Sequence, residues 1–201
     1  MHNIYMALSG KGFIAMPCLL FILLFSSMGF AQPVQFSKDS IPAVDEEVVF
    51  VVQFDYELNK EEFFRRTYSY LNDQLNPYSG VFLINNEDST VCLITDYLEI
   101  LSNPIAVFGM YMTYNLHLTY KDGNCTMVFR NISFMEKGHF EAQEKSQRKL
   151  NMPEYSGKDI MIDKNYSRLM MRDASEKITE ATVERINEII KNLDLIFMRE
   201  K

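Results

Sequence analysis

The strongest constraint on the fold is a pair of alternating segments joined by a very short turn. Residues 111–120 and 125–134 alternate large apolar side chains with smaller or more polar ones, which is the period of a half-buried strand. Lys121-Asp122-Gly123-Asn124 lies between them, and Asp-Gly is favoured in type I′ turns, whose two central residues both have positive φ. A two-residue turn fixes the register of the hairpin.

This register divides the side chains of the hairpin between two faces of a sheet. One face is apolar, and its expected pairs are Tyr120 with Cys125, Leu118 with Met127, and Leu116 with Phe129. The other face is more polar, and its expected pairs are Thr119 with Thr126, His117 with Val128, and Asn115 with Arg130. We therefore expect an antiparallel sheet that helices cover on one face and water contacts on the other.

The rest of the chain supplies further strands and two helices to this sheet. Alternation and turn residues predict strands at 48–55, 81–84 and 90–100. Asn59 can cap a helix, and the apolar residues expected on its buried face are Phe64, Tyr68, Leu71 and Leu75. A closing helix is predicted over residues 178–197, where apolar residues recur every three to four positions.

Periodicity is weakest between Gly138 and Asp173, where charged residues are frequent and Pro153 and Gly157 interrupt the pattern. We interpret this segment as mostly loop, with a short helix near residues 158–162. The polar residues 32–47 are expected to form an extended N-terminal segment. Residues 48–201 are therefore predicted to form a single α+β domain with about five strands.

The first 31 residues have the composition of a secretion signal. Lys11 precedes an apolar stretch, and Gly29-Phe30-Ala31 places small residues where a signal peptidase cleaves, which predicts a mature chain starting at Gln32. An uncleaved anchor is the alternative, because residues 13–31 are nominally long enough to span a bilayer, although Pro17 and other residues interrupt them. We expect no stable membrane span after cleavage.

The charge of the mature chain limits the classes of partner. All 27 acidic residues remain, whereas Lys11 is lost from the 20 basic residues, so 19 remain and the formal charge is −8. Nucleic-acid binding depends on clustered Lys and Arg, and no basic run is visible beyond Arg65-Arg66. The sequence therefore argues against a nucleic-acid partner.

Three segments resemble a known family of exported proteins. They are Ile41-Pro42-Ala43-Val44-Asp45-Glu46-Glu47-Val48-Val49-Phe50, Leu116-His117-Leu118-Thr119-Tyr120-Lys121-Asp122-Gly123-Asn124-Cys125, and Pro153-Glu154-Tyr155-Ser156-Gly157-Lys158-Asp159. Together with the order of the elements, they resemble domain-of-unknown-function family 4468, found largely in Bacteroidetes. The resemblance implies a TBP-like fold, a curved antiparallel sheet with helices on one face, and a periplasmic or surface location in a Gram-negative bacterium. It implies no activity and no site residue.

The strand order implied by this resemblance bears on the two cysteines of the mature chain. It places one strand between the strands of Cys92 and Cys125, so their Cα atoms would lie about 9 to 10 Å apart. A disulfide requires less than about 7 Å. Two buried thiols are favoured, although an exported protein permits a disulfide, and the pairing stays open.

The candidate functional residues lie on the polar face of the sheet. Asn115, His117 and Arg130 could contact a ligand or a partner there, although solvated strand side chains would look the same. Asp163-Lys164-Asn165-Tyr166-Ser167 begins like a calcium loop, but Arg168 replaces the glycine that such a loop needs. No catalytic residue, metal site or cofactor site is therefore predicted.

The function predicted from these observations is a non-enzymatic binding module of the cell envelope. It would use its open sheet face to bind an envelope protein or a small ligand. The alternative is a hydrolase whose site is assembled from dispersed carboxylates, because nucleophile motifs are absent from the sequence.

Overall fold

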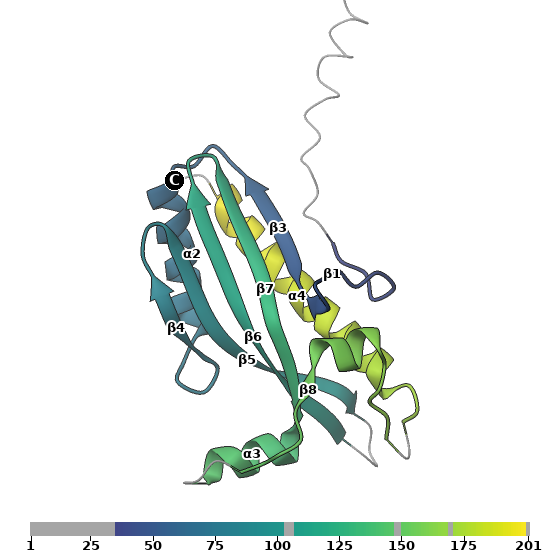
Figure 1. Cartoon of the computed structure of the whole chain (residues 1–201). Coiled ribbons are helices and arrows are strands. Elements are labelled where there is room, and N and C mark those ends of the chain that lie inside the picture. Colours follow the sequence, from purple (N-terminus) through teal and green to yellow (C-terminus); the bar gives the residue numbers. More distant parts are fainter. Residues whose placement is uncertain (1–34, 103–106, 147–149, 169–170, 200–201) are drawn as a thin grey trace, which may run out of the picture. The chain divides into compact units, whose positions relative to one another are not determined.

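The chain forms an antiparallel sheet with strand order β3-β7-β6-β5-β4, as a computed structural model shows (Figure 1). The structure describes residues 35–102, 107–146, 150–168 and 171–199, and the predicted secretion signal lies outside them. The strands are β3 (Phe50–Asp55), β4 (Gly80–Asn85), β5 (Ser89–Ser102), β6 (Val107–Lys121) and β7 (Asn124–Glu136). A sixth, short strand, β8 (Tyr155–Ser156), pairs with β7. The predicted α+β class and antiparallel sheet are thus confirmed.

The β6–β7 hairpin has the register expected from the sequence, and the six pairs predicted for its two faces all form. The turn itself differs from the expectation, because Gly123 has a φ of 79° whereas Asp122 is not at positive φ. This turn is therefore not of type I′. Residues outside the hairpin stabilise the turn, since Gly123 N donates to Leu58 O at 2.8 Å and Lys60 N donates to the Asp122 carboxylate at 2.9 Å.

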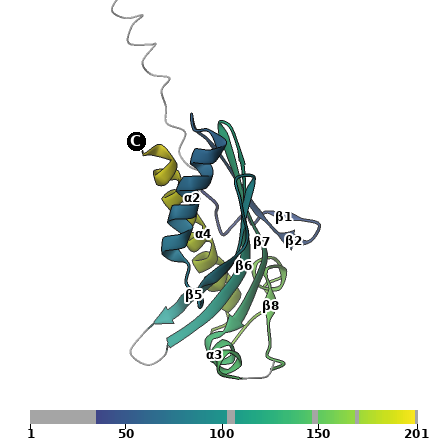
Figure 2. The same cartoon turned by 90° about the vertical axis from the view of Figure 1, so that its left-hand side faces the viewer.

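Two helices, α2 (Lys60–Gln74) and α4 (Ala174–Met198), cover one face of the sheet (Figure 2). Asn59 caps α2 as predicted, because its side chain accepts from Glu62 N at 2.8 Å. The buried face of α2 was wrongly assigned in part. Phe63 and Thr67 point into the core, whereas Tyr68 is 40% exposed and lies beside Phe82 of β4.

The core lies between these helices and the apolar face of the sheet. It includes Phe50, Leu116, Leu118, Met127 and Phe129, none of which has measurable exposure. An aromatic cluster joins the layers at one end, where Phe197 of α4 meets Phe54 of β3 at 5.2 Å and Phe63 of α2 at 5.0 Å between ring centroids. The open face of the sheet is the opposite one.

The prediction of a loop after Gly138 was wrong for its first part. Residues Lys137–Lys145 form helix α3, which has no buried residue and so leaves little apolar periodicity in the sequence. The ring of Phe140 stacks on Tyr111 at 4.0 Å, and Lys137 Nζ lies 5.2 Å from the Tyr97 ring centroid. The short helix predicted near residues 158–162 is present as a π-helix, η1 (Lys158–Ile162).

The N-terminal segment before β3 contains a small hairpin of β1 (Ala43–Val44) and β2 (Glu47–Val48). Phe36 is fixed on α4, because its backbone N–H and C=O both bond the Asn187 side chain at 2.9 Å. Glu47 accepts a hydrogen bond from Asn131 N at 2.7 Å, which holds the hairpin against β7.

Cys92 and Cys125 are both buried and free, on strands separated by β6. Burial raises the pKa of each thiol to about 12, so both are protonated at neutral pH and are poor nucleophiles.

We expect an alkylating reagent to leave both thiols unlabelled in the native protein and to label both after denaturation without reductant. Mass spectrometry of the two samples checks this. Labelling of the native protein, or none after denaturation, would contradict it.

Candidate functional site

The open face of the sheet carries a row of side chains with one residue from each of five strands, and four of these residues are aliphatic. Its members are in register from strand to strand, in the order Ile84, Val91, His117, Val128 and Val51. We call the four aliphatic residues Ile84, Val91, Val128 and Val51 the apolar row. Val51 and Ile84 at its two ends are 49% and 46% exposed, so the row is open to solvent rather than buried under a helix.

Polar side chains flank the apolar row on one side, and polar and apolar side chains together flank it on the other. One neighbouring row consists of Ser89, Thr119, Thr126 and Gln53. The other contains Asn115 and Arg130, followed outward by Leu93 and Val81. The face therefore combines an aliphatic centre with hydroxyl, amide and guanidinium groups.

The three residues predicted as a contact face lie together on this surface, but their roles differ. His117 is at the centre of the apolar row, between Val91 and Val128, and Asn115 lies opposite Arg130. Within the described residues, neither His117 nor Asn115 forms a side-chain hydrogen bond or an ion pair, so both can bond to a partner. Arg130 is already engaged, because its Nη2 lies 3.3 Å from a carboxylate oxygen of Glu47.

Helix α3 covers one end of the open face and restricts the area that a partner can contact. Phe140 covers Tyr111, and Tyr111 lies opposite Tyr97 on the same face of the sheet. Figure 2 shows α3 on the other side of the sheet from α2 and α4. The accessible part of the face is therefore the half that holds the apolar row.

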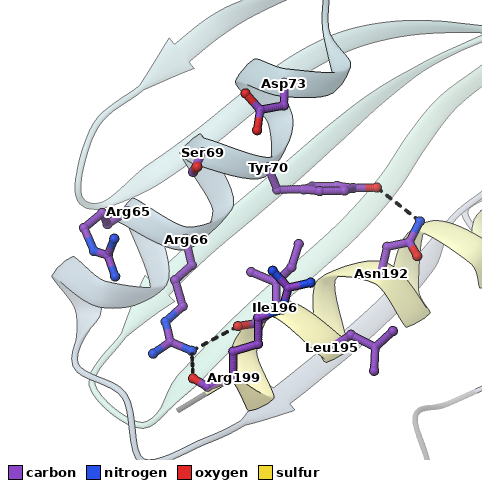
Figure 3. Close-up of a pocket in the computed structure, with 9 residues that line it drawn as sticks. All are labelled: Arg65, Arg66, Ser69, Tyr70, Asp73, Asn192, Leu195, Ile196 and Arg199. Carbon is purple, nitrogen blue, oxygen red and sulfur yellow. Dashed lines mark hydrogen bonds between the residues drawn. The ribbon is translucent and has the colours of Figure 1, made fainter. Parts of the chain in front are cut away.

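A groove of about 540 Å³ lies on the opposite side of the domain, between α2 and α4 (Figure 3). Its lining residues are Arg65, Arg66, Ser69, Tyr70, Asp73, Asn192, Leu195, Ile196 and Arg199. The arginines gather at one end, where α2 begins and α4 ends, and Asp73 lies toward the other end. In the sequence, Arg65-Arg66 stands out only as a short basic run, and the groove that the two arginines line could not be recognised.

Arg66 is the fixed part of this groove. Its side chain is 9% exposed, its Nε bonds Glu62 at 2.6 Å, and its Nη1 donates to the carbonyl oxygens of Ile196, Phe197 and Arg199. These are terminal carbonyls of α4, which have no partner within the helix. Arg66 therefore supplies hydrogen-bond donors to the last carbonyl groups of α4 and links this end of the helix to α2.

Glu62 is the counterion of both arginines of α2. It accepts two hydrogen bonds from Arg65, at 2.9 and 2.6 Å, and one from Arg66. Hydrogen bonds from Arg65 and then Arg66 lower the pKa of Glu62 from 4.5 to about 2. Glu62 therefore remains ionised throughout the neutral range.

Two carboxylates in the described part of the chain, Asp96 and Asp194, are engaged by different partners. Asp96 accepts from Arg185 at 3.0 and 3.1 Å and from Tyr114 at 2.9 Å. Asp194 accepts separately from Tyr56 at 2.5 Å.

Among the residues that the structure describes, no group of three His, Cys, Asp or Glu side chains could hold a metal ion. None of the helices in this part of the chain has the length and apolar composition that a membrane span requires.

Comparison with known proteins identifies the fold. No protein-family model matches the sequence, and no curated protein matches it. A DUF4468 family protein from Bacteroides ovatus matches the structure with a TM-score of 0.63 and 16% identity, over 80% of this chain and 91% of that chain. A TBP-like protein from Parabacteroides distasonis matches with a TM-score of 0.62 and 12% identity, over 80% of this chain and 99% of that one.

These two neighbours, both from Bacteroidetes, confirm the resemblance predicted from the sequence. At 12 and 16% identity they establish a shared TBP-like fold and transfer no function to this chain.

Proposed function

We propose that the protein is an exported, non-enzymatic binding module that contacts another polypeptide through the open face of its sheet. The observation that carries this proposal is the exposed apolar row with unengaged His117 and Asn115 beside it. Exposed aliphatic side chains with hydrogen-bonding groups beside them are typical of a protein interface, where apolar contacts supply affinity and hydrogen bonds supply specificity.

The dimensions of the apolar row indicate a weak complex. Four strand spacings of about 4.8 Å give a width of about 19 Å, and α3 limits the face along the strands. A stable complex buries roughly 800 Å² on each partner, and transient complexes bury less. A surface of this size supports a transient complex that exchanges readily.

The hydrolase alternative gains no support from the arrangement of the carboxylates. Asp96 forms an ion pair with Arg185, and Asp194 accepts a hydrogen bond from Tyr56, so each carboxylate is engaged by a different partner. General acid–base catalysis by two carboxylates needs both of them beside one substrate position.

A substitution at the end of the apolar row tests the proposal against a matched control. Val51→Glu places a charge in the open face, and Leu195→Glu makes the same change on α4, at exposures of 49% and 48%. We expect chemical cross-linking in envelope extracts to join the wild type and Leu195→Glu to the same protein. Val51→Glu should reduce that product about tenfold, because a charge that loses water at an interface costs more than 1.4 kcal/mol.

Quantitative mass spectrometry of the cross-linked product measures this ratio. Equal yields from Val51→Glu and the wild type, with both variants folded by circular dichroism, would show that the open face is not the contact surface.

A further inference from the structure

The groove between α2 and α4 carries a local positive charge on an acidic protein. Three arginines line it, and Glu62 is the counterion of Arg65 and Arg66 among the described residues. Asp73 lines the groove toward its other end. The whole chain has 27 acidic and 20 basic residues, so this concentration of arginine departs from the average. Charges of one sign in a concave surface raise the local concentration of oppositely charged ligands.

Arg199 has the side chain that is free to bind a ligand. It is exposed, and within the described residues its guanidinium forms no hydrogen bond or ion pair, although its carbonyl accepts from Arg66. Arg65 is 64% exposed and shares Glu62 with Arg66. A guanidinium offers donors in a planar fork that matches carboxylate and phosphate oxygens.

Neutral donors continue the groove beyond the arginines. Tyr70 reaches from α2 toward Asn192 on α4, and the two side chains meet at 3.5 Å, a long contact that either can exchange for a ligand (Figure 3). Burial raises the pKa of Tyr70, so its hydroxyl stays protonated and can donate at neutral pH. The hydroxyl of Ser69 also lines the groove.

We propose that this groove is a binding site for a small organic oxyanion, a carboxylate or a phosphate. The ligand contacts the free guanidinium of Arg199, the Arg65 donors that Glu62 does not occupy, and the polar groups of Tyr70 and Asn192. The site is separate from the open sheet face, because its lining residues belong to α2, to α4 and to Arg199, and the two helices cover the other face. Arg66 positions it by fixing the end of α4.

Asp73 restricts the choice of ligand. It is exposed and lies seven residues from Arg66 on the same helix, about 10 Å along its axis. A second negative charge at that end of a ligand would be repelled, whereas a hydroxyl or an ammonium group would be accepted. The expected ligand therefore carries its negative charge at one end.

Calorimetric titration of the purified protein with inorganic phosphate and with acetate tests the site, with ionic strength held constant by chloride. At least one probe should bind saturably at concentrations up to about 50 mM, and the tighter probe identifies the oxyanion class. Arg199→Ala should weaken binding about tenfold, the effect of losing one charge-assisted pair. Arg172→Ala, which removes an exposed arginine outside the groove, should leave the affinity unchanged.

A second variant should change the affinity in the opposite direction. Glu62→Gln removes the carboxylate that competes for Arg65 and Arg66, so we expect it to strengthen binding of the same probe several-fold. The proposal is overturned if neither probe binds saturably. It is also overturned if Arg199→Ala and Arg172→Ala have equal effects, or if Glu62→Gln weakens binding while the fold is retained.

Discussion

Replacing Phe197 with alanine is expected to lower the free energy of unfolding by about 3 to 5 kcal/mol. Phe197 is 2% exposed and makes edge-to-face contacts with Phe54 on β3 and Phe63 on α2. The substitution leaves a cavity where α4, α2 and the sheet meet, and it removes these two contacts and a third with the Tyr56 ring. Urea unfolding followed by circular dichroism measures the loss.

The control for Phe197→Ala lies two residues earlier on the same helix. Leu195 is 48% exposed, so Leu195→Ala should change the free energy of unfolding by no more than about 0.5 kcal/mol. Similar losses for both variants would mean that the face of α4 that carries Phe197 is not buried against α2 and the sheet.

Replacing Asp96 with alanine is expected to lower the free energy of unfolding by about 3 kcal/mol, because it removes the carboxylate that accepts hydrogen bonds from Arg185 and Tyr114. Arg185 on α4 would lose two hydrogen bonds of 3.0 and 3.1 Å, and the Tyr114 hydroxyl, on a side chain that is 1% exposed, would lose its acceptor. These bonds join Arg185 of α4 to Asp96 of β5 and Tyr114 of β6, so they hold the helix against the sheet.

Glu99→Ala provides the matched control for Asp96→Ala, since it removes an exposed carboxylate from the same strand. We expect thermal unfolding to show a large decrease in the midpoint for Asp96→Ala and little change for Glu99→Ala. A small effect of Asp96→Ala would contradict the role of this ion pair.

The central hairpin could be predicted from the sequence because its determinants are local. A two-residue turn sets the pairing of Leu116 with Phe129, and alternation then assigns each side chain to a face. The conformation of the turn could not be predicted, because the bonds that Gly123 and Asp122 form with residues 58 and 60 depend on the packing of a distant segment.

Helix α3 could not be predicted because it buries no residue. Apolar periodicity reports burial, and α3 is attached to the sheet mainly through Phe140 on Tyr111 and Lys137 over Tyr97. These contacts join residues whose proximity depends on the tertiary fold.

The candidate sites show the same division between local and distant determinants. Alternation placed Asn115, His117 and Arg130 on one face, but recognising the apolar row required the registers of all five strands. The groove could not be predicted, because it depends on contacts such as that of Arg66 with Phe197, 131 residues away in the sequence. The pairing of Arg130 with Glu47 across 83 residues was also missed.

Site-specific photo-cross-linking in living cells measures the proposed contact of the open face most directly. A benzophenone amino acid at position 117 would lie in the apolar row, and the same amino acid at position 191 would lie on the exposed side of α4. Irradiation should join the protein to a partner from position 117 and not from position 191. No product from position 117, or equal products from both positions, would contradict binding through the open face.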